Sequence, residues 1–209
     1  GSSRGGRLRA SMPGCGGLIP RGMAGHSPDI CLRYDPDLAK QLLIEAGYPK
    51  EGNLPVLIGS FTLHKYYSLE ILRQWQTNLG VRGEFFPYEE TSDLIQHPLE
   101  ERNFLFTCWA GDPYPDSFIR FVFDLLLGVK CKDAPLEEYV EQLAAIQDRT
   151  QHMTLSRRAD QYLVKEQAFV IPLGYERVRF IHYIQPWVKG YRRAPNGRID
   201  YRNVSLLPH

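Results

Sequence analysis

The sequence predicts an α/β fold in which a mixed β-sheet is flanked by helices. Amphipathic segments with a helical period alternate with short apolar segments along most of the 209 residues. Apolar residues make up 43% of the chain and charged residues 23%, which is ordinary for a globular protein and sufficient for a core.

The clearest expected helix lies in "YDPDLAKQLLIEAGYP", residues 34–49. Asp35 is the expected cap, Pro36 takes the first helical position, and Gly47 ends the helix before Pro49. Its apolar positions fall on one face. These positions are Ala39, Leu42, Leu43 and Ala46.

The remaining elements follow from the same signals. A further helix is expected at about 64–79, with Gly80 as its stop. Others are expected from about Asp116, from Pro135, and from about Thr154, which we take as the cap of the last helix. Strands are expected at about 54–61, 81–88, 103–109, 168–176 and 177–184. In the tail, a turn at 195–197 lies between two short extended pieces.

Composition excludes several function classes. A formal charge of +1 gives no global reason to expect nucleic-acid binding. No apolar run approaches the roughly 18 residues of a membrane span, and residues 1–26 lack the apolar core of a signal peptide. The four cysteines form no C-x-x-C pair, and we expect buried or incidental thiols that bind no metal. In a secreted protein they could instead form disulfides, with Cys15 and Cys31 the easiest pair by distance in sequence.

The sequence also lacks the motifs of common enzymes and cofactor-binding proteins. It contains no G-x-S-x-G, H-E-x-x-H, G-x-G-x-x-G or P-loop, and we therefore expect neither a cofactor nor catalysis. A hydrolase would need a nucleophile and a base, and no such constellation is recognisable.

The stretch "CWAGDPYPDSF", residues 108–118, has two interpretations. In the structural one, Trp109 belongs to the core, Asp112 caps a turn and Asp116 caps the next helix. In the functional one, Trp109 and Asp112 face a ligand from a loop that the prolines hold in shape. Composition and periodicity leave both open.

Six segments, in order, resemble the extracellular solute-binding proteins of family 5, the oligopeptide, dipeptide and nickel receptors of ABC importers. The resemblance covers nearly the whole chain from about Gly14. The segments are "LIPRGMAGHSP", "YDPDLAKQLLIEAGYP", "LRQWQTNLGV", "WAGDPYPDSF", "RRADQYLVKEQAFVIPLGYE" and "IQPWVKGY".

The resemblance implies the C-terminal lobe of a two-lobed fold of the periplasmic binding protein type II kind. Residues 1–26 would be the crossover from an N-terminal lobe, 27–186 the ligand-binding lobe, and 187–209 a tail that returns to the first lobe. The chain would then be an excerpt of a longer protein. Trp187, Val188, Tyr191 and Tyr201 of the tail would lack their partner surface, and we expect a disordered tail or self-association through it.

The resemblance also implies a binding site. The aspartate of the family's tryptophan–aspartate loop pairs with the α-ammonium of a peptide, and Asp112 matches it, with Trp109 three residues earlier and Tyr114 in the same loop. Family loops often read D-x-x-D-P, whereas here the proline precedes Asp116, which leaves the ligand class open.

Two functions follow. One is the substrate-binding component of an importer for peptides or other small solutes with a free amino group, which closes by a hinge and docks on an ABC permease outside the cytoplasm, in the periplasm or at the cell surface. The alternative is the ligand-sensing domain of a cytoplasmic transcriptional regulator built on the same fold. The sequence upstream of Gly1 would separate them: a signal peptide favours transport, and a helix-turn-helix favours sensing.

Overall fold

The computed structural model describes residues 12–13, 16–30, 32–48, 56–89, 103–105, 114–128, 131–175, 184–193 and 199–208. The chain divides into two compact units. The first comprises residues 1–32, 110–124 and 133–209, and the second comprises residues 33–109 and 125–132.

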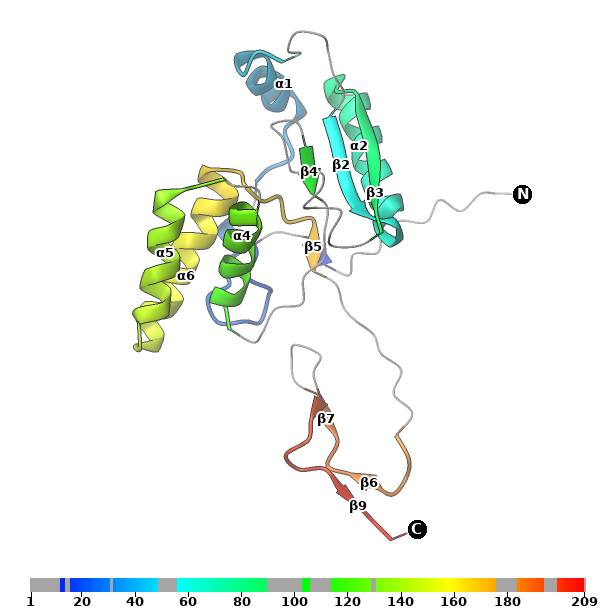
Figure 1. Ribbon diagram of the computed structural model, residues 1–209, viewed down its shortest axis with the longest axis vertical. Helices are drawn as coiled ribbons and strands as arrows, with labels where there is room; N and C mark the ends of the chain where they lie inside the picture. The colour runs from blue at the N-terminus through cyan, green and yellow to red at the C-terminus, as the bar shows by residue number, and fades with distance from the viewer. Residues whose placement is uncertain are drawn as a thin grey trace, which may run out of the picture. The chain divides into compact units, whose positions relative to one another are not determined.

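The second unit is built on a three-stranded parallel sheet in the order β3-β2-β4 (Figure 1). The strands are β2 (Val56–Phe61), β3 (Gly83–Tyr88) and β4 (Asn103–Leu105). Val56 pairs with Gly83, and Leu57 pairs with Asn103. The three strands expected at 54–61, 81–88 and 103–109 are present, and the part of the third beyond residue 105 lies outside the described residues.

Helix α2 (Lys65–Leu79) connects β2 to β3, as a parallel crossover requires. Leu72 is its buried apolar contact, and Trp75 meets Phe104 edge-on at 5.1 Å between ring centroids. The helix ends where predicted, at Gly80, which adopts a left-handed conformation.

Helix α1 (Pro36–Glu45) has the predicted bounds and the predicted cap. The Asp35 Oδ1 accepts a hydrogen bond of 2.9 Å from the Leu38 N–H. Its apolar side chains are not buried among the described residues, since Leu42 is 54% exposed. The short loop before β2 lies outside the described residues.

The first unit contains α5 (Ala134–Ala145) and α6 (Arg149–Gln161), which pack side by side (Figure 1). A π-helical turn (Tyr162–Glu166) extends α6. The predicted cap of this last helix was wrong: Asp148 caps it by accepting from the Gln151 N–H, whereas Thr154 lies mid-helix and donates to the Thr150 carbonyl. Serine and threonine hydroxyls do this readily inside helices, so a Thr before an apolar run is an ambiguous cap signal.

Asp133 joins these helices by two kinds of contact. Its Oδ1 accepts from the Leu136 N–H at 2.9 Å and thereby caps α5, and it also accepts from the Tyr162 hydroxyl at 2.8 Å. Burial is the main reason that the pKa of Tyr162 rises to about 12, and the hydrogen bond to Asp133 adds to it.

Helix α4 (Asp116–Gly128) follows the loop of interest, with Ile119 and Val122 buried. Within 168–175, the described part of the strand expected at 168–176, β5 (Gly174–Tyr175) is the segment that forms a strand, and it pairs antiparallel with β1 (Met12–Pro13). The strand expected at 177–184 lies almost wholly outside the described residues.

The tail forms short antiparallel pairs. β6 (Val188–Lys189) pairs with β9 (Ser205–Leu206), and β7 (Arg192–Arg193) pairs with β8 (Ile199–Asp200). The second pair matches the two extended pieces predicted around the turn at 195–197, whose residues lie outside the described part of the chain. Self-association through the tail stays a prediction.

The core of the first unit gives a direct test of the packing. Leu163 is 0% exposed, and Leu173 in the same unit is 50% exposed. We expect Leu163→Ala to lower the free energy of unfolding by about 2–5 kcal/mol, because it leaves a cavity. Leu173→Ala is the control and should change it by about 0.5 kcal/mol or less. Urea unfolding followed by circular dichroism measures both, and equal losses would contradict this core assignment.

Candidate functional site

The structure describes one of the three predicted site residues. Trp109 and Asp112 lie outside the described residues, whereas Tyr114 is described and its side chain is 66% exposed. The Tyr114 carbonyl oxygen accepts from the Ser117 N–H at 3.2 Å and from the Ser117 hydroxyl at 2.8 Å. The end of the loop is therefore tied to the first turn of α4, with the Tyr114 ring projecting into solvent.

Pro115, the next residue, is buried. It lies against Gly25: a Cβ built on that glycine would stand 3.2 Å from the Pro115 Cβ. Asp116 begins α4, and its Oδ1 is 3.8 Å from the His152 Nε2 on α6. We call residues 114–117 the shoulder of the loop. Two other parts of the first unit lie next to it: Gly25 beside Pro115, and His152 beside Asp116.

Gly25 belongs to the segment 16–26, which we call the entry loop. The entry loop is held by the side chain of Asp160, a residue of α6 that is 0% exposed. The Leu18 N–H donates to Asp160 Oδ1 at 2.8 Å, and the Ile19 N–H donates to Oδ2 at 3.3 Å. Successive backbone N–H groups that converge in this way form a concave site for an anion.

Glycine is required where the loop passes over the carboxylate. Gly17 has φ of +79°, and a Cβ there would lie 2.3 Å from Asp160 Oδ2. No larger side chain fits between the loop backbone and the carboxylate.

Two further side chains satisfy the carbonyls of the entry loop. The Tyr175 hydroxyl donates to the Gly17 carbonyl at 2.7 Å. His26 Nδ1 lies 2.8 Å from the Ile19 carbonyl, and because a carbonyl only accepts, this nitrogen carries the proton that it donates. The His26 and Tyr175 rings meet edge-on, with centroids 6.3 Å apart.

Burial dominates the electrostatics of this cluster. Loss of hydration raises the pKa of the Asp160 carboxyl from 3.8 to about 6, opposed by the Leu18 and Ile19 hydrogen bonds and by His26. Burial also raises the pKa of Tyr175 to about 12, and the nearby Asp160 carboxylate adds to this shift. The tyrosine is therefore a neutral donor at physiological pH.

Sequence reasoning missed Asp160, although a signal was present. In "RRADQYLV" the aspartate stands among Ala159, Tyr162 and Leu163, all of which are buried. An acidic residue inside the apolar stripe of a helix has to be paired, and a glycine-rich loop with free N–H groups is a suitable partner. Ile19 and Asp160 are 141 residues apart along the chain, and periodicity gives no information on such a distant pairing.

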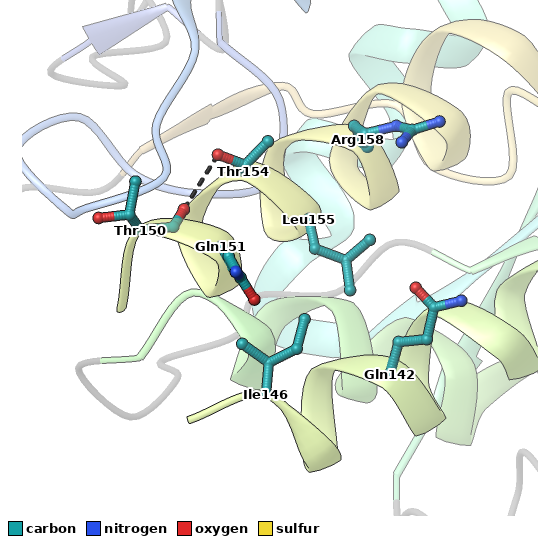
Figure 2. A pocket seen from close by; sticks show the side chains of 7 residues that line it. All are labelled: Gln142, Ile146, Thr150, Gln151, Thr154, Leu155 and Arg158. Carbon is teal, nitrogen blue, oxygen red and sulfur yellow. Dashed lines mark hydrogen bonds between the residues drawn. The ribbon is translucent and has the colours of Figure 1, made fainter. Parts of the chain in front are cut away.

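A second feature of the first unit is a groove between α5 and α6 (Figure 2). It has a volume of about 290 Å³ and is largely open to solvent. Of the described residues that line it, only Arg158 is charged. We assign no ligand to this groove. Its lining residues are Gln142, Ile146, Thr150, Gln151, Thr154, Leu155 and Arg158.

Two classes of feature are missing from the part of the chain that the structure describes. None of its helices has the length and apolar character needed to cross a membrane. Among the same residues, no group of three or more histidine, cysteine, aspartate or glutamate side chains is placed to hold a metal ion.

Comparison with known proteins gives sequence relatives but no matching protein-family model. The chain is 25% identical over 203 residues to the dipeptide-binding protein of Escherichia coli K12, covering 90% of this chain and 37% of that protein. It is 26% identical over 177 residues to the periplasmic oligopeptide-binding protein OppA of Salmonella typhimurium LT2, covering 82% and 32%. It is 28% identical over 188 residues to heme-binding protein A of Haemophilus influenzae, covering 83% and 33%.

Solved structures agree on the fold. The oligopeptide-binding protein AppA of Bacillus subtilis, in complex with a nonapeptide, matches with a TM-score of 0.63 at 17% identity, over 94% of this chain and 43% of AppA. The resemblance to solute-binding proteins and the α/β fold of the periplasmic binding protein type II kind are thereby confirmed. The chain spans about a third of the length of the curated relatives that it matches.

The buried carboxylate predicts a pH dependence of stability. Asp160 has a pKa of about 6 in the fold against 3.8 for an unperturbed aspartate, so the folded state favours the protonated form. The contribution of this carboxyl to the free energy of unfolding is fully present below pH 3.8 and is lost as the pH rises through 6. We expect the stability of the wild-type protein, relative to Asp160→Asn, to fall by about 2 kcal/mol between pH 4 and pH 7.

Urea unfolding at both pH values measures this difference. The exposed Asp124, on α4, supplies the control variant Asp124→Asn, for which the difference from the wild-type protein should not change in this way. A constant difference for Asp160→Asn as well would mean that the carboxyl titrates like an exposed one.

Proposed function

We propose that this chain is part of the substrate-binding component of an ABC importer, and that it captures a peptide between two lobes by hinge closure. The observation that supports this most is its likeness, over most of its length, to proteins that bind dipeptides and oligopeptides. In this proposal residues 27–186 form the ligand-binding lobe, and residues 1–26 and 187–209 connect it to a second lobe.

The proposal extends to partners and location. The partners are a peptide with a free amino group and an ABC permease, and the protein acts outside the cytoplasm, as the name of one relative indicates for that relative. It performs no catalysis and uses no cofactor. The heme-binding relative makes a flat, apolar ligand the main competing class.

The proposed contacts come from the loop that contains Trp109, Asp112 and Tyr114. The Asp112 carboxylate receives the α-ammonium of the peptide in a charge-assisted hydrogen bond, which becomes stronger when closure excludes water. Trp109 and Tyr114 pack against the peptide backbone or its first side chains. The exposed Tyr114 ring on the fixed shoulder is compatible with this role, because it costs little conformational entropy to bury on binding.

A single substitution tests the ammonium contact. In the full-length protein, Asp112→Asn removes the negative charge and keeps the shape of the side chain. We expect it to weaken binding of tri-alanine by about 2 kcal/mol or more, because a desolvated ammonium loses its counter-charge. Titration calorimetry measures the dissociation constant.

N-acetylated tri-alanine is the control ligand, because it has no ammonium to lose. The wild-type protein should bind it more weakly than tri-alanine, and Asp112→Asn should leave its affinity nearly unchanged. Equal losses for both peptides would show that Asp112 supports the loop only. Binding of heme by the wild-type protein, with no binding of either peptide, would contradict the proposed function.

A further inference from the structure

We infer that Gly25 is a positioning residue that couples the entry loop to the shoulder of the ligand loop. The entry loop, fixed on Asp160, then sets where Tyr114 stands. The inference rests on the proposed function for its meaning in binding, but the coupling itself is a property of the first unit and is measurable without a ligand.

The entry loop has a fixed position. Its Leu18 and Ile19 N–H groups are held by Asp160, and its Gly17 and Ile19 carbonyls are held by Tyr175 and His26. The Ile19 side chain is itself fully buried. A segment bonded through both its donors and its acceptors has little freedom to shift.

Gly25 of the entry loop contacts Pro115. Gly25 is buried and has φ of +92°. A Cβ on this glycine would lie 3.2 Å from the Pro115 Cβ, 3.6 Å from the Pro115 Cγ and 3.4 Å from the Ile19 Cδ1. A methyl group on Gly25 would therefore fit against Ile19 but would press on the Pro115 ring, which would have to shift by a few tenths of an ångström.

Backbone hydrogen bonds connect Pro115 and Tyr114 to the first turn of α4. The Pro115 carbonyl accepts from the Phe118 N–H at 3.3 Å, and the Tyr114 carbonyl accepts from the Ser117 N–H at 3.2 Å. Any displacement of the proline ring therefore strains the first turn of α4 and moves Tyr114 with it. Rigid rings and close packing transmit such shifts, because a dense interior has no slack.

The entry loop contains its own control. Gly22 has φ of +90°, almost the same as Gly25, but a Cβ there would meet nothing within 4 Å. Gly22→Ala and Gly25→Ala therefore place alanine at nearly the same positive φ, and only the second brings a Cβ against Pro115. The difference between the two variants isolates the contact.

Hydrogen exchange of the full-length protein measures the coupling directly. We expect the Ser117 and Phe118 amides to exchange about tenfold faster in Gly25→Ala than in Gly22→Ala, with the Leu136 amide at the start of α5 as the reference for global opening. The double variant Gly25→Ala, Pro115→Gly relieves the clash and should reduce this excess. Equal exchange in the two alanine variants would overturn the inference.

A folding failure of Gly25→Ala also decides the question. If Pro115→Gly restores folding, then the two residues are coupled, and if it does not, the contact is not the cause and the inference fails.

Binding of tri-alanine is measured on the same variants. We expect Gly25→Ala to raise the dissociation constant about tenfold over Gly22→Ala. If the wild-type protein binds no peptide, the proposed function fails, while the exchange data still decide the coupling. If the exchange rates differ but the affinities do not, the role of Gly25 in binding is wrong.

Discussion

The pairing of one buried carboxylate with two backbone N–H groups is the constraint on which the first unit depends. Residues 16–26 form no helix or strand, and beyond two turn hydrogen bonds within the loop their backbone groups need side chains as partners. Asp160 supplies two acceptors, and Tyr175 and His26 supply donors. A buried aspartate without these partners would be strongly destabilising, and the loop without the aspartate would leave the Leu18 and Ile19 N–H groups unpaired. Each is stable because of the other.

Helix α6 brings this constraint to the candidate site. It carries Asp160 beneath the entry loop and His152 beside the first residue of α4. A helix is a rigid element, and residues held on such elements keep their relative positions better than residues on loops. In the proposed receptor, Tyr114 therefore stands on a shoulder whose Asp116 lies 3.8 Å from His152 on α6 and whose Pro115 contacts Gly25 of the entry loop, which Asp160 holds.

Local sequence signals were sufficient for most of the fold but not for this arrangement. Asp35, Pro36 and Gly80 act within one helical turn of the backbone groups that they affect, so they predicted α1 and the end of α2 correctly. The prediction of Thr154 as a cap was wrong because a threonine hydroxyl can also hydrogen-bond a carbonyl inside a helix. Among the described residues, the strand expected at 168–176 forms only at 174–175, and its partner is the distant β1, which composition does not reveal. The same holds for Asp160 and the entry loop, while Trp109 and Asp112 rest on resemblance alone.

Nuclear magnetic resonance of the Leu18 and Ile19 amides tests the central claim most directly. An amide proton bonded to a carboxylate changes its chemical shift when that carboxylate is protonated. The account predicts that both resonances titrate together with a midpoint at about pH 6, and that the titration disappears in Asp160→Asn. Resonances that do not titrate, or whose titration persists unchanged in Asp160→Asn, would show that Asp160 does not hold the entry loop.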